Sequence, residues 1–376
     1  MANKKRLIKL MQELIRFDSQ NPPGGEAAIA RFVSAYLKNL GVSAKIYAFK
    51  KGRANVIALL KGKDPKHSLL ITPHLDTVPV GRNWHFPPFA AEIHKGRIYG
   101  LGATDCKCNL AAALEAINSI VEENRVLGYN LIFAATADEE TGSGLGLIPL
   151  LNKEILAPTQ ALILDADDFG IIITQKGLIH LKVKIEGRRA HGAYPWLGLN
   201  AIDLALKIIQ EIKSYKFIYP KNKYLKGPTI NLGTIKGGDK VNIVADWCEF
   251  ELDIRTPVGM SQKEILKKIK RSVLKYAAKF KIEIEGIQKP YFISGKHPLV
   301  SSLSRAMRKI GVVFKIMGSE GATVITFFQD KKIPAVATGF GVEGRAHSND
   351  EYVEIENLYK GAKVLEEFLT HYKFSG

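Results

Sequence analysis

Short apolar segments alternate with helix-length segments through the first part of the chain, and this alternation limits the possible folds more than any other feature. Ser68–Thr72, Asn130–Ala137 and Ala161–Leu164 have the length and apolar content of buried strands. Glu26–Leu40 and Asn109–Glu122 instead have the length and pattern of helices. Strands that alternate with helices predict an α/β fold, a mostly parallel sheet with helices on both faces.

The pattern changes near Gln175, where a different kind of unit begins. Leu178–Glu186 alternates apolar and polar residues, as an antiparallel strand with one solvated face does. With the segments that follow, it gives the order strand, helix, strand, strand, helix, strand, a split-βαβ pattern typical of ferredoxin-like α+β domains. The expected bounds are Leu178–Glu186, Asn200–Ser214, Thr229–Lys236, Asp246–Ile254, Ser261–Phe280 and Lys281–Gly286. Helix–strand alternation resumes at Pro298, so we predict one domain from residues 1–176 and 291–376, with a smaller domain inserted at 177–290.

The charge balance is basic, because 54 Lys and Arg residues stand against 37 Asp and Glu residues, a net charge of +17. Such an excess can indicate nucleic acid or another anionic partner. The basic residues are scattered, however, in Lys-rich stretches such as Lys263–Lys275, and no basic motif is interleaved with aromatic residues. A solvated, Lys-rich surface that attracts anionic substrates therefore fits better than a nucleic-acid partner.

Length and the remaining composition are those of a globular protein. The 376 residues, 46% of them hydrophobic, suffice for two domains and a large core. Three cysteines, Cys106, Cys108 and Cys248, give no disulfide framework. Met1–Phe17 is an amphipathic, polar-interrupted helix pattern rather than a signal peptide, and no apolar run reaches membrane-spanning length. We therefore expect a cytoplasmic protein with no membrane partner.

Acidic and histidine side chains stand where the predicted strands end. Pro73 ends the strand Ser68–Thr72 because it has no N–H for the ladder, and His74 and Asp76 follow directly. The other positions at strand ends or in the loops after them are Asp105, Glu139, Glu140, Asp165 and His347. Because the carboxyl ends of parallel strands gather at one edge of a sheet, we expect these side chains to converge there.

Clustered carboxylates need a counter-charge, since like charges raise one another's pKa. Two divalent ions about 3.5–4 Å apart, bridged by one carboxylate, are a known hydrolytic arrangement that supplies it. Each residue also has an ordinary explanation, with Glu139 and Glu140 as a helix N-terminal pair, Asp105 and Asp165 as turn or cap residues, and His347 as a structural histidine. The strand-end position that they share favours a metal site.

Several motifs, kept in order over nearly the whole chain, resemble the M20 family of metallopeptidases and deacylases. They are His-x-Asp at residues 74–76, Gly-x-Gly-x-x-Asp-x-Lys at 100–107, Asp-Glu-Glu-x-Gly-Ser at 138–143 and His-Ser-x-x-Glu at 347–351. The segment Asn21–Glu26 and the inserted domain belong to the same resemblance. That group includes acetylornithine deacetylase, succinyl-diaminopimelate desuccinylase, aminoacylase and carboxypeptidase G2.

The resemblance implies a dinuclear metal site in the larger domain. It implies two divalent ions, with Zn²⁺ preferred over Co²⁺ or Mn²⁺, Asp105 as the bridging ligand and a cis peptide bond between Asp105 and Cys106. The implied ligands are His74, Asp105 and Asp165 for one ion and Asp105, Glu140 and His347 for the other. Asp76 would accept the second ring N–H of His74, which fixes its tautomer. Glu139 would be the general base that takes a proton from the attacking water and passes it to the leaving amine.

The inserted domain would act as a lid and dimerisation domain. By resemblance, His191 in Gly187–Pro195 and Asn242 hold or polarise the scissile carbonyl, and Gly321 contacts substrate. Arg255 would bind a substrate carboxylate, although an ion pair within the sheet with a neighbouring acid explains it nearly as well. The resemblance further implies a homodimer in which His191 enters the active site of the partner subunit.

Three departures from the family pattern bear on the metal site and on the substrate. Cys106 and Cys108 flank Lys107 after the bridging acid, where a cysteine could ligate a metal or simply pack at a helix start. Desuccinylases and deacetylases usually have Glu at the position of Asp165. The Asp slightly favours the peptidase-like branches of the family. The segment Gly318–Val324 lacks the Asp and Arg that follow the matching glycine in desuccinylases.

These features predict a metal-dependent amidohydrolase that cleaves an N-acyl or peptide amide next to a free carboxylate and releases an amino acid. A carboxypeptidase G2-like exopeptidase or dipeptidase is the alternative within this class. A catalytically dead binding protein on the same fold is the alternative outside it, and the presence of Glu139 with a full ligand set argues against it.

Overall fold

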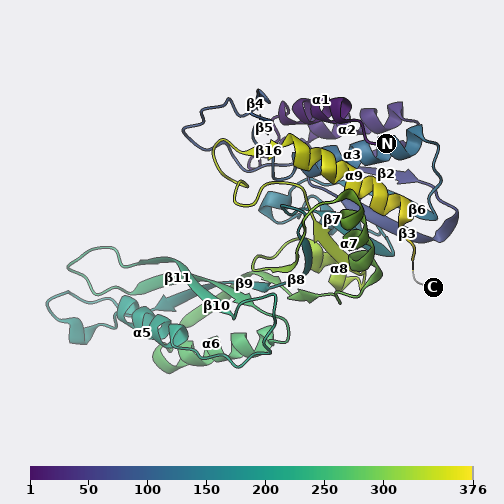
Figure 1. Ribbon diagram of the computed structural model, residues 1–376. Helices are drawn as coiled ribbons and strands as arrows, with labels where there is room; N and C mark the ends of the chain where they lie inside the picture. The colour runs from purple at the N-terminus through teal and green to yellow at the C-terminus, as the bar shows by residue number, and fades with distance from the viewer. Residues whose placement is uncertain (375–376) are drawn as a thin grey trace. The chain divides into compact units, whose positions relative to one another are not determined.

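The computed structural model describes residues 1–374 and divides the chain into two compact units (Figure 1). The first unit comprises Met1–Ile173, Ile293–Met317 and the described residues from Phe327 onward. The second comprises Thr174–Phe292 and Gly318–Thr326, a segment that the division drawn from the sequence assigned to the larger domain. Within residues 1–374, no helix has both the length and the apolar content needed to cross a membrane.

A sheet with a parallel centre forms the core of the first unit. Its strand order is β1-β2-β6-β3-β7-β15-β8. The strands are β1 (Ser43–Lys50), β2 (Arg53–Leu60), β3 (Asp64–Thr72), β6 (Tyr129–Ala135), β7 (Gln160–Leu164), β8 (Ile171–Gln175) and β15 (Ala335–Thr338). The pairs β3–β6, β3–β7 and β7–β15 are parallel, while β1–β2, β2–β6 and β15–β8 are antiparallel. The predicted fold class is thereby confirmed, with antiparallel strands added at both sides.

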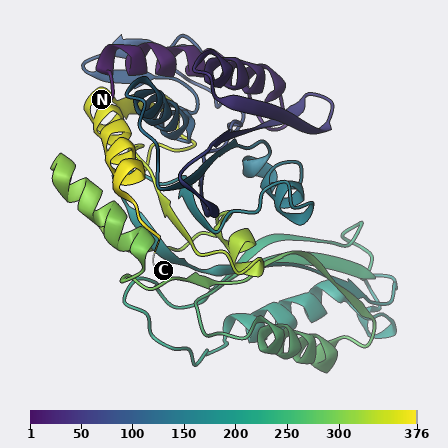
Figure 2. The ribbon, with the colours of Figure 1, turned by 90° about the vertical axis from the view of Figure 1, so that its right-hand side faces the viewer.

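Helices pack around this sheet (Figure 2). They are α1 (Lys4–Ile15), α2 (Ala27–Asn39), α3 (Lys107–Glu122), α4 (Leu147–Asn152), α7 (Pro298–Ile310), α8 (Ile325–Asp330) and α9 (Ile355–His371). Helix α2 packs on β1 and β2, whereas α3 and α9 pack together with α1 and α7. The alanines of α3 follow from its position, because every residue from Lys107 to Ile120 is buried and small side chains allow close packing.

The second unit is an antiparallel sheet covered on one face by two helices. The sheet order is β10-β11-β9-β12, with β9 (Gly177–Glu186), β10 (Thr229–Gly237), β11 (Trp247–Thr256) and β12 (Phe280–Gln288). Helices α5 (Ala201–Lys213) and α6 (Gln262–Tyr276) pack on the inward residues, which form a continuous apolar core. The outward face carries ion pairs instead, such as Lys182 with Glu251 and Glu285, each at 2.8 Å. The apolar and polar residues that alternate along β9 therefore point alternately to the buried and the outward face of the sheet.

Short elements complete the fold. A three-stranded sheet has the order β16-β5-β4, from β4 (Ile93–His94), β5 (Arg97–Tyr99) and β16 (Tyr352–Glu354). The strands β13 (Tyr291–Phe292) and β14 (Ile316–Ser319) both pair with β8. Single 3-10 turns lie at Glu139–Thr141 and Pro195–Leu197.

Two boundaries differ by four residues from those expected from the sequence, and other boundaries differ by less. Strand β3 begins at Asp64 rather than Ser68, and its register with β6 is irregular between these two residues. The first four residues of β3 are Asp64, Pro65, Lys66 and His67, so the apolar pattern that predicted the strand does not include them. Helix α6 ends at Tyr276 rather than Phe280, which is the first residue of β12.

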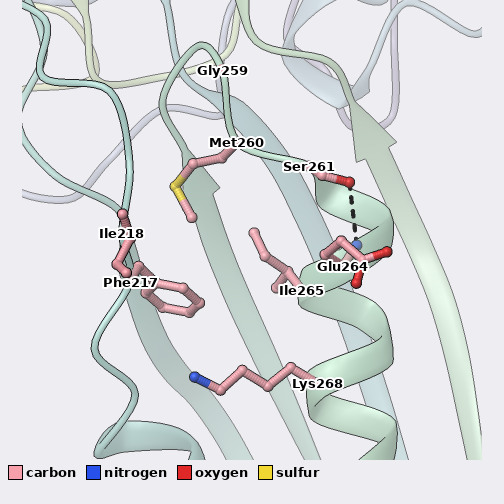
Figure 3. A pocket seen from close by; sticks show the side chains of 8 residues that line it. All are labelled: Phe217, Ile218, Gly259, Met260, Ser261, Glu264, Ile265 and Lys268. Atoms are coloured by element: carbon pink, nitrogen blue, oxygen red, sulfur yellow. Dashed lines mark hydrogen bonds between the residues drawn. The ribbon is translucent and has the colours of Figure 1, made fainter.

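A cavity of about 190 Å³ opens beside the first turns of α6 (Figure 3). Phe217, Met260 and Ile265 give it an apolar lining, and Lys268 borders it. Ser261 caps the helix there, because its hydroxyl accepts the main-chain N–H of Glu264 at 3.3 Å. None of the site residues predicted from the sequence lines this cavity.

We expect acid to weaken the packing of α5 on α6 through Glu211. Its carboxylate accepts hydrogen bonds from Ser272, Lys275 and Tyr276 at 2.6–2.8 Å, and the Lys275 ammonium contributes most to lowering the pKa of Glu211 to about 2. Because the pKa in the folded state lies below the unfolded value of about 4.3, this stabilisation is present above that pH and is lost as the pH falls toward 2. Glu211→Gln should therefore melt below the wild type at pH 7, with the difference shrinking below pH 4.

Thermal unfolding followed by circular dichroism at several pH values measures this difference. Glu264→Gln is the matched control, since the exposed Glu264–Lys267 pair should contribute little. A difference that is constant with pH would contradict the assignment.

Candidate metal centre

The ends of parallel strands position two of the candidate ligands, and all of these ligands lie in the first unit. His74 follows β3 and forms a bridge with Thr136, the residue after β6. Asp165 follows β7, and its main-chain N–H donates to the carbonyl of Thr338 at the end of β15. Both side chains therefore stand at the carboxyl edge of the parallel strands, where open α/β sheets place their sites.

Loops supply the remaining candidates. Asp105 lies in the turn before α3, and its peptide bond to Cys106 is cis, as expected. Glu139 and Glu140 begin the 3-10 turn after β6. His347 lies between β15 and β16 with φ of 58°, a left-handed conformation that is uncommon outside glycine.

The two oxygens of Asp105 face two different histidines. Oδ1 lies 2.8 Å from Nε2 of His74, while Oδ2 lies 3.1 Å from Nε2 of His347. The same His347 nitrogen lies 3.2 Å from Oε2 of Glu140. Burial acts to raise the pKa of Asp105, but the hydrogen bonds from His347 and His74 hold it well below its ordinary value. A carboxylate placed in this way can serve two sites at once.

In the described part of the chain, three groups of side chains bring ligand atoms within 4.8 Å of one another. Asp105, Glu140 and His347 form one group, which matches one of the expected ligand sets. His74 and Asp165 fall together in another, where Glu139 stands in the place expected for Asp105. The third group contains His74, Asp105 and Cys106.

Cys106 is a buried thiol that already has main-chain partners. Its Sγ accepts the N–H of His74 at 3.2 Å and lies 3.5 Å from the carbonyl of the same residue. Burial raises the pKa of Cys106 to about 12, so the group is protonated at neutral pH. These contacts favour the packing role over ligation, in line with its place as the N-cap of α3.

The acidic groups of the site repel one another. Burial, followed by the charge of Asp165, raises the pKa of Glu139 well above its ordinary value. Burial, followed by the charge of Asp105, raises the pKa of Asp165 to about 6. Among residues 1–374, Oε1 of Glu140 is a buried oxygen that lacks a hydrogen-bond partner. Crowded carboxylates, imidazole nitrogens and an unpartnered buried oxygen together fit divalent cations, for which these are ordinary ligands.

Asp76 contacts the ring of His74 through its main-chain carbonyl and, at a longer distance, through its carboxylate. His74 directs Nδ1 to the main-chain carbonyl of Asp76 at 3.0 Å, whereas the carboxylate Oδ1 is 3.6 Å away. The Asp76 carboxylate also accepts the main-chain N–H groups of Glu139 and Glu140, each at 3.1 Å. Asp76 therefore fixes the orientation of His74 through its backbone and the position of the acidic pair through its side chain.

Glu351 is a site residue that the sequence reasoning did not assign, although it closes the motif His-Ser-x-x-Glu. It is buried, and its carboxylate accepts the main-chain N–H groups of Gly102, Thr104 and Asp105 at 2.8–2.9 Å. Burial raises the pKa of Glu351 to about 7 against the opposing effect of these hydrogen bonds. Glu351 thus holds the turn that presents Asp105.

The predicted substrate-binding residues belong to the second unit, whereas the candidate ligands belong to the first. His191 and Asn242 are brought together there, because His191 bridges Ile243 and the N–H of Gly192 donates to the carbonyl of Asn242. Arg255 donates to both carboxylate oxygens of Asp253 at 2.8 and 3.0 Å, the ion pair within the sheet that was its alternative explanation. Gly321 donates its N–H to the hydroxyl of Ser319.

Known peptidases and deacylases are similar to this chain in sequence and fold. The model of peptidase family M20/M25/M40 matches residues 70–371. The chain is 28% identical to an acetylornithine deacetylase of Aliivibrio fischeri, over 93% of each chain. It is 25% identical to a succinyl-diaminopimelate desuccinylase of Orientia tsutsugamushi, over 97% of this chain and 95% of the relative. The structure of an aminopeptidase from Bacillus cereus superimposes with a TM-score of 0.81 at 24% identity, over 98% of each chain.

Replacing His347 should weaken metal binding without unfolding the protein. The imidazole is half-exposed and contacts two of the candidate ligands, Asp105 and Glu140, so its loss removes a donor rather than core packing. We expect His347→Ala to retain fewer metal ions per chain after dialysis against a metal buffer, measured by elemental analysis. His371→Ala, a change of the same kind at the end of α9, is the control. Equal metal content in the two variants would remove His347 from the ligand set.

Proposed function

The chain belongs to peptidase family M20/M25/M40, and from this premise we propose that it cleaves an N-acyl or peptide amide next to a free carboxylate with two divalent ions, Zn²⁺ by preference. That it is a metal-dependent hydrolase of amide bonds follows from the family and from relatives named as deacetylase and desuccinylase. The observation that carries the finer proposal is Asp105, whose two oxygens face His74 and His347.

The proposed ligands divide between two ions that share Asp105. His74 and Asp165 would complete one set, and Glu140 with His347 would complete the other. When bound, such ions act as Lewis acids that polarise a carbonyl and lower the pKa of water. The unpartnered oxygen of Glu140 and the mutual repulsion of the acids support this assignment.

Glu139 would act as the general base. Burial and neighbouring acids raise the pKa of its carboxylate above the ordinary value, and a carboxylate with a raised pKa is a stronger base. Its carboxylate would take a proton from the attacking water and deliver it to the leaving nitrogen. Asp76 would support this role, since it accepts the main-chain N–H of Glu139 and so fixes where the side chain begins.

The second unit would supply the groups that hold the substrate. His191 and Asn242, which lie on adjoining loops, would contact the scissile carbonyl, and Gly321 would contact the substrate. Asp253 occupies the Nε–Nη2 edge of Arg255, so a substrate carboxylate would bind the remaining Nη1–Nη2 edge or displace Asp253. Two features favour an exopeptidase or dipeptidase as the second candidate function, namely Asp165 in place of Glu and the absence of the desuccinylase residues in Gly318–Val324.

Glu139→Gln should keep the metal ions and lose amide hydrolysis, because the amide cannot accept the proton. We expect turnover to fall about 10²- to 10⁴-fold, the range for loss of a general base. The assay would screen N-acetyl and N-succinyl amino acids and dipeptides with Zn²⁺, Co²⁺ and Mn²⁺, with metal content measured in parallel. The exposed Glu154→Gln is the control and should behave as wild type. Near-native turnover in Glu139→Gln would overturn the mechanism.

We also propose that the protein is a homodimer in which His191 acts in the partner's site. The histidine is exposed on the second unit, and β10 and β12 form the two edges of that unit's sheet, where another chain can pair. Glu139→Gln and His191→Ala should each be inactive alone. After subunit exchange, activity should return, because one site of each mixed dimer then contains both native residues. Confirmed exchange without recovered activity, or an active monomer, would refute the dimeric site.

A further inference from the structure

The turn that carries Glu139 and Glu140 has little regular structure to hold it. It is a single 3-10 turn, Glu139–Thr141, preceded by Asp138 and followed by Gly142, both with positive φ (68° and 104°). A turn of this length has few internal hydrogen bonds, so side chains from elsewhere must fix its position. Asp76 holds its first two N–H groups from one side.

Asn21 connects Asp76 with the other side of the turn. Its side-chain nitrogen lies 2.9 Å from Oδ2 of Asp76, 3.0 Å from Oγ1 of Thr141 and 3.3 Å from Oδ1 of Asp138. Asn21 is buried, so these contacts form away from bulk water, where hydrogen bonds to charged groups are strong. The Thr141 hydroxyl in turn donates to Asp138 at 2.6 Å.

Arg53 and Glu26 form hydrogen bonds with the side chain and the main chain of Asp138. The Arg53 guanidinium donates to both oxygens of Glu26 at 2.6 and 2.7 Å and to Oδ1 of Asp138 at 2.7 Å. Glu26 also accepts the main-chain N–H of Asp138 at 3.2 Å. Glu26 and Arg53 are buried, and they come from the start of α2 and the start of β2. The turn is therefore joined to two regular elements of the first unit.

We infer that Asn21, supported by Arg53 and Glu26, is a positioning residue that sets where Glu139 and Glu140 stand relative to the other ligands. The inference rests on the roles proposed above for these two acids. Asn21 reaches neither side-chain carboxylate itself and acts through Asp76, Asp138 and Thr141. Loss of this link frees the turn without removing any candidate ligand.

Two variants test the hydrogen bonds of Asn21, one by removing all of them and the other by removing those of the Thr141 hydroxyl. Asn21→Ala removes the amide, while Thr141→Val keeps the shape of an exposed residue and removes the hydroxyl that joins Asn21 to Asp138. Thr370→Val is the matched control, since its hydroxyl donates within α9 to the carbonyl of Glu366. With saturating Co²⁺, we expect kcat to fall about ten- to hundredfold for Asn21→Ala and by less for Thr141→Val, with KM unchanged.

A second readout separates positioning from general damage to the fold. The visible absorption of the Co²⁺-loaded protein reports ligand geometry, so it should change in Asn21→Ala and Thr141→Val but not in Thr370→Val. Native kcat and an unchanged Co²⁺ spectrum in both test variants would overturn the inference. If Glu139→Gln is inactive while Asn21→Ala and Thr141→Val are native, only the positioning role fails. If Glu139→Gln is itself active, the proposed function fails first.

Discussion

Buried carboxylates that accept main-chain N–H groups hold the loops of the candidate metal centre, and the geometry of the ligands depends on them. Glu351 takes the N–H groups of the turn before Asp105, and Asp76 takes those of Glu139 and Glu140. Both acceptors are buried, and the low pKa of Asp76 keeps its carboxylate charged, which makes its hydrogen bonds about twice as strong as neutral ones. The loops are thereby held in place although they contain little helix or strand.

The same region concentrates negative charge that a protein selected for stability alone would avoid. Asp165 and Glu139 both have raised pKa values, with burial as the main cause and their acidic neighbours adding to it. Burial and mutual repulsion of these carboxylates destabilise the folded chain. A cation that binds only the folded chain offsets this cost by mass action. Arg53 lies on the other side of the acidic turn, where Glu26 and Asp138 share its single positive charge.

The second unit folds around its own apolar core and presents its polar groups on loops and on the outer sheet face. Two loops are joined by the His191–Ile243 bridge and by the hydrogen bond from Gly192 to Asn242. Residues that are far apart in sequence thereby become neighbours on one surface. Arg255 illustrates the opposite outcome, since its guanidinium is engaged by Asp253 on the same strand.

The sequence by itself determined the fold class, the membership in the M20 family and the strand-end positions of His74 and Asp165, whereas loops carry the other candidate ligands. The spacing of apolar residues along a strand or helix can be read from residues that are close in sequence. The strand after Gln175 and the Ala-rich helix that ends at Glu122 could therefore be identified from the local pattern. Only the tertiary structure decided which groups surround Asp76 and Asp138. Asn21 lies 55 residues from Asp76, and Arg53 lies 85 residues from Asp138. No local pattern encodes such pairs, because packing of separate elements brings them together.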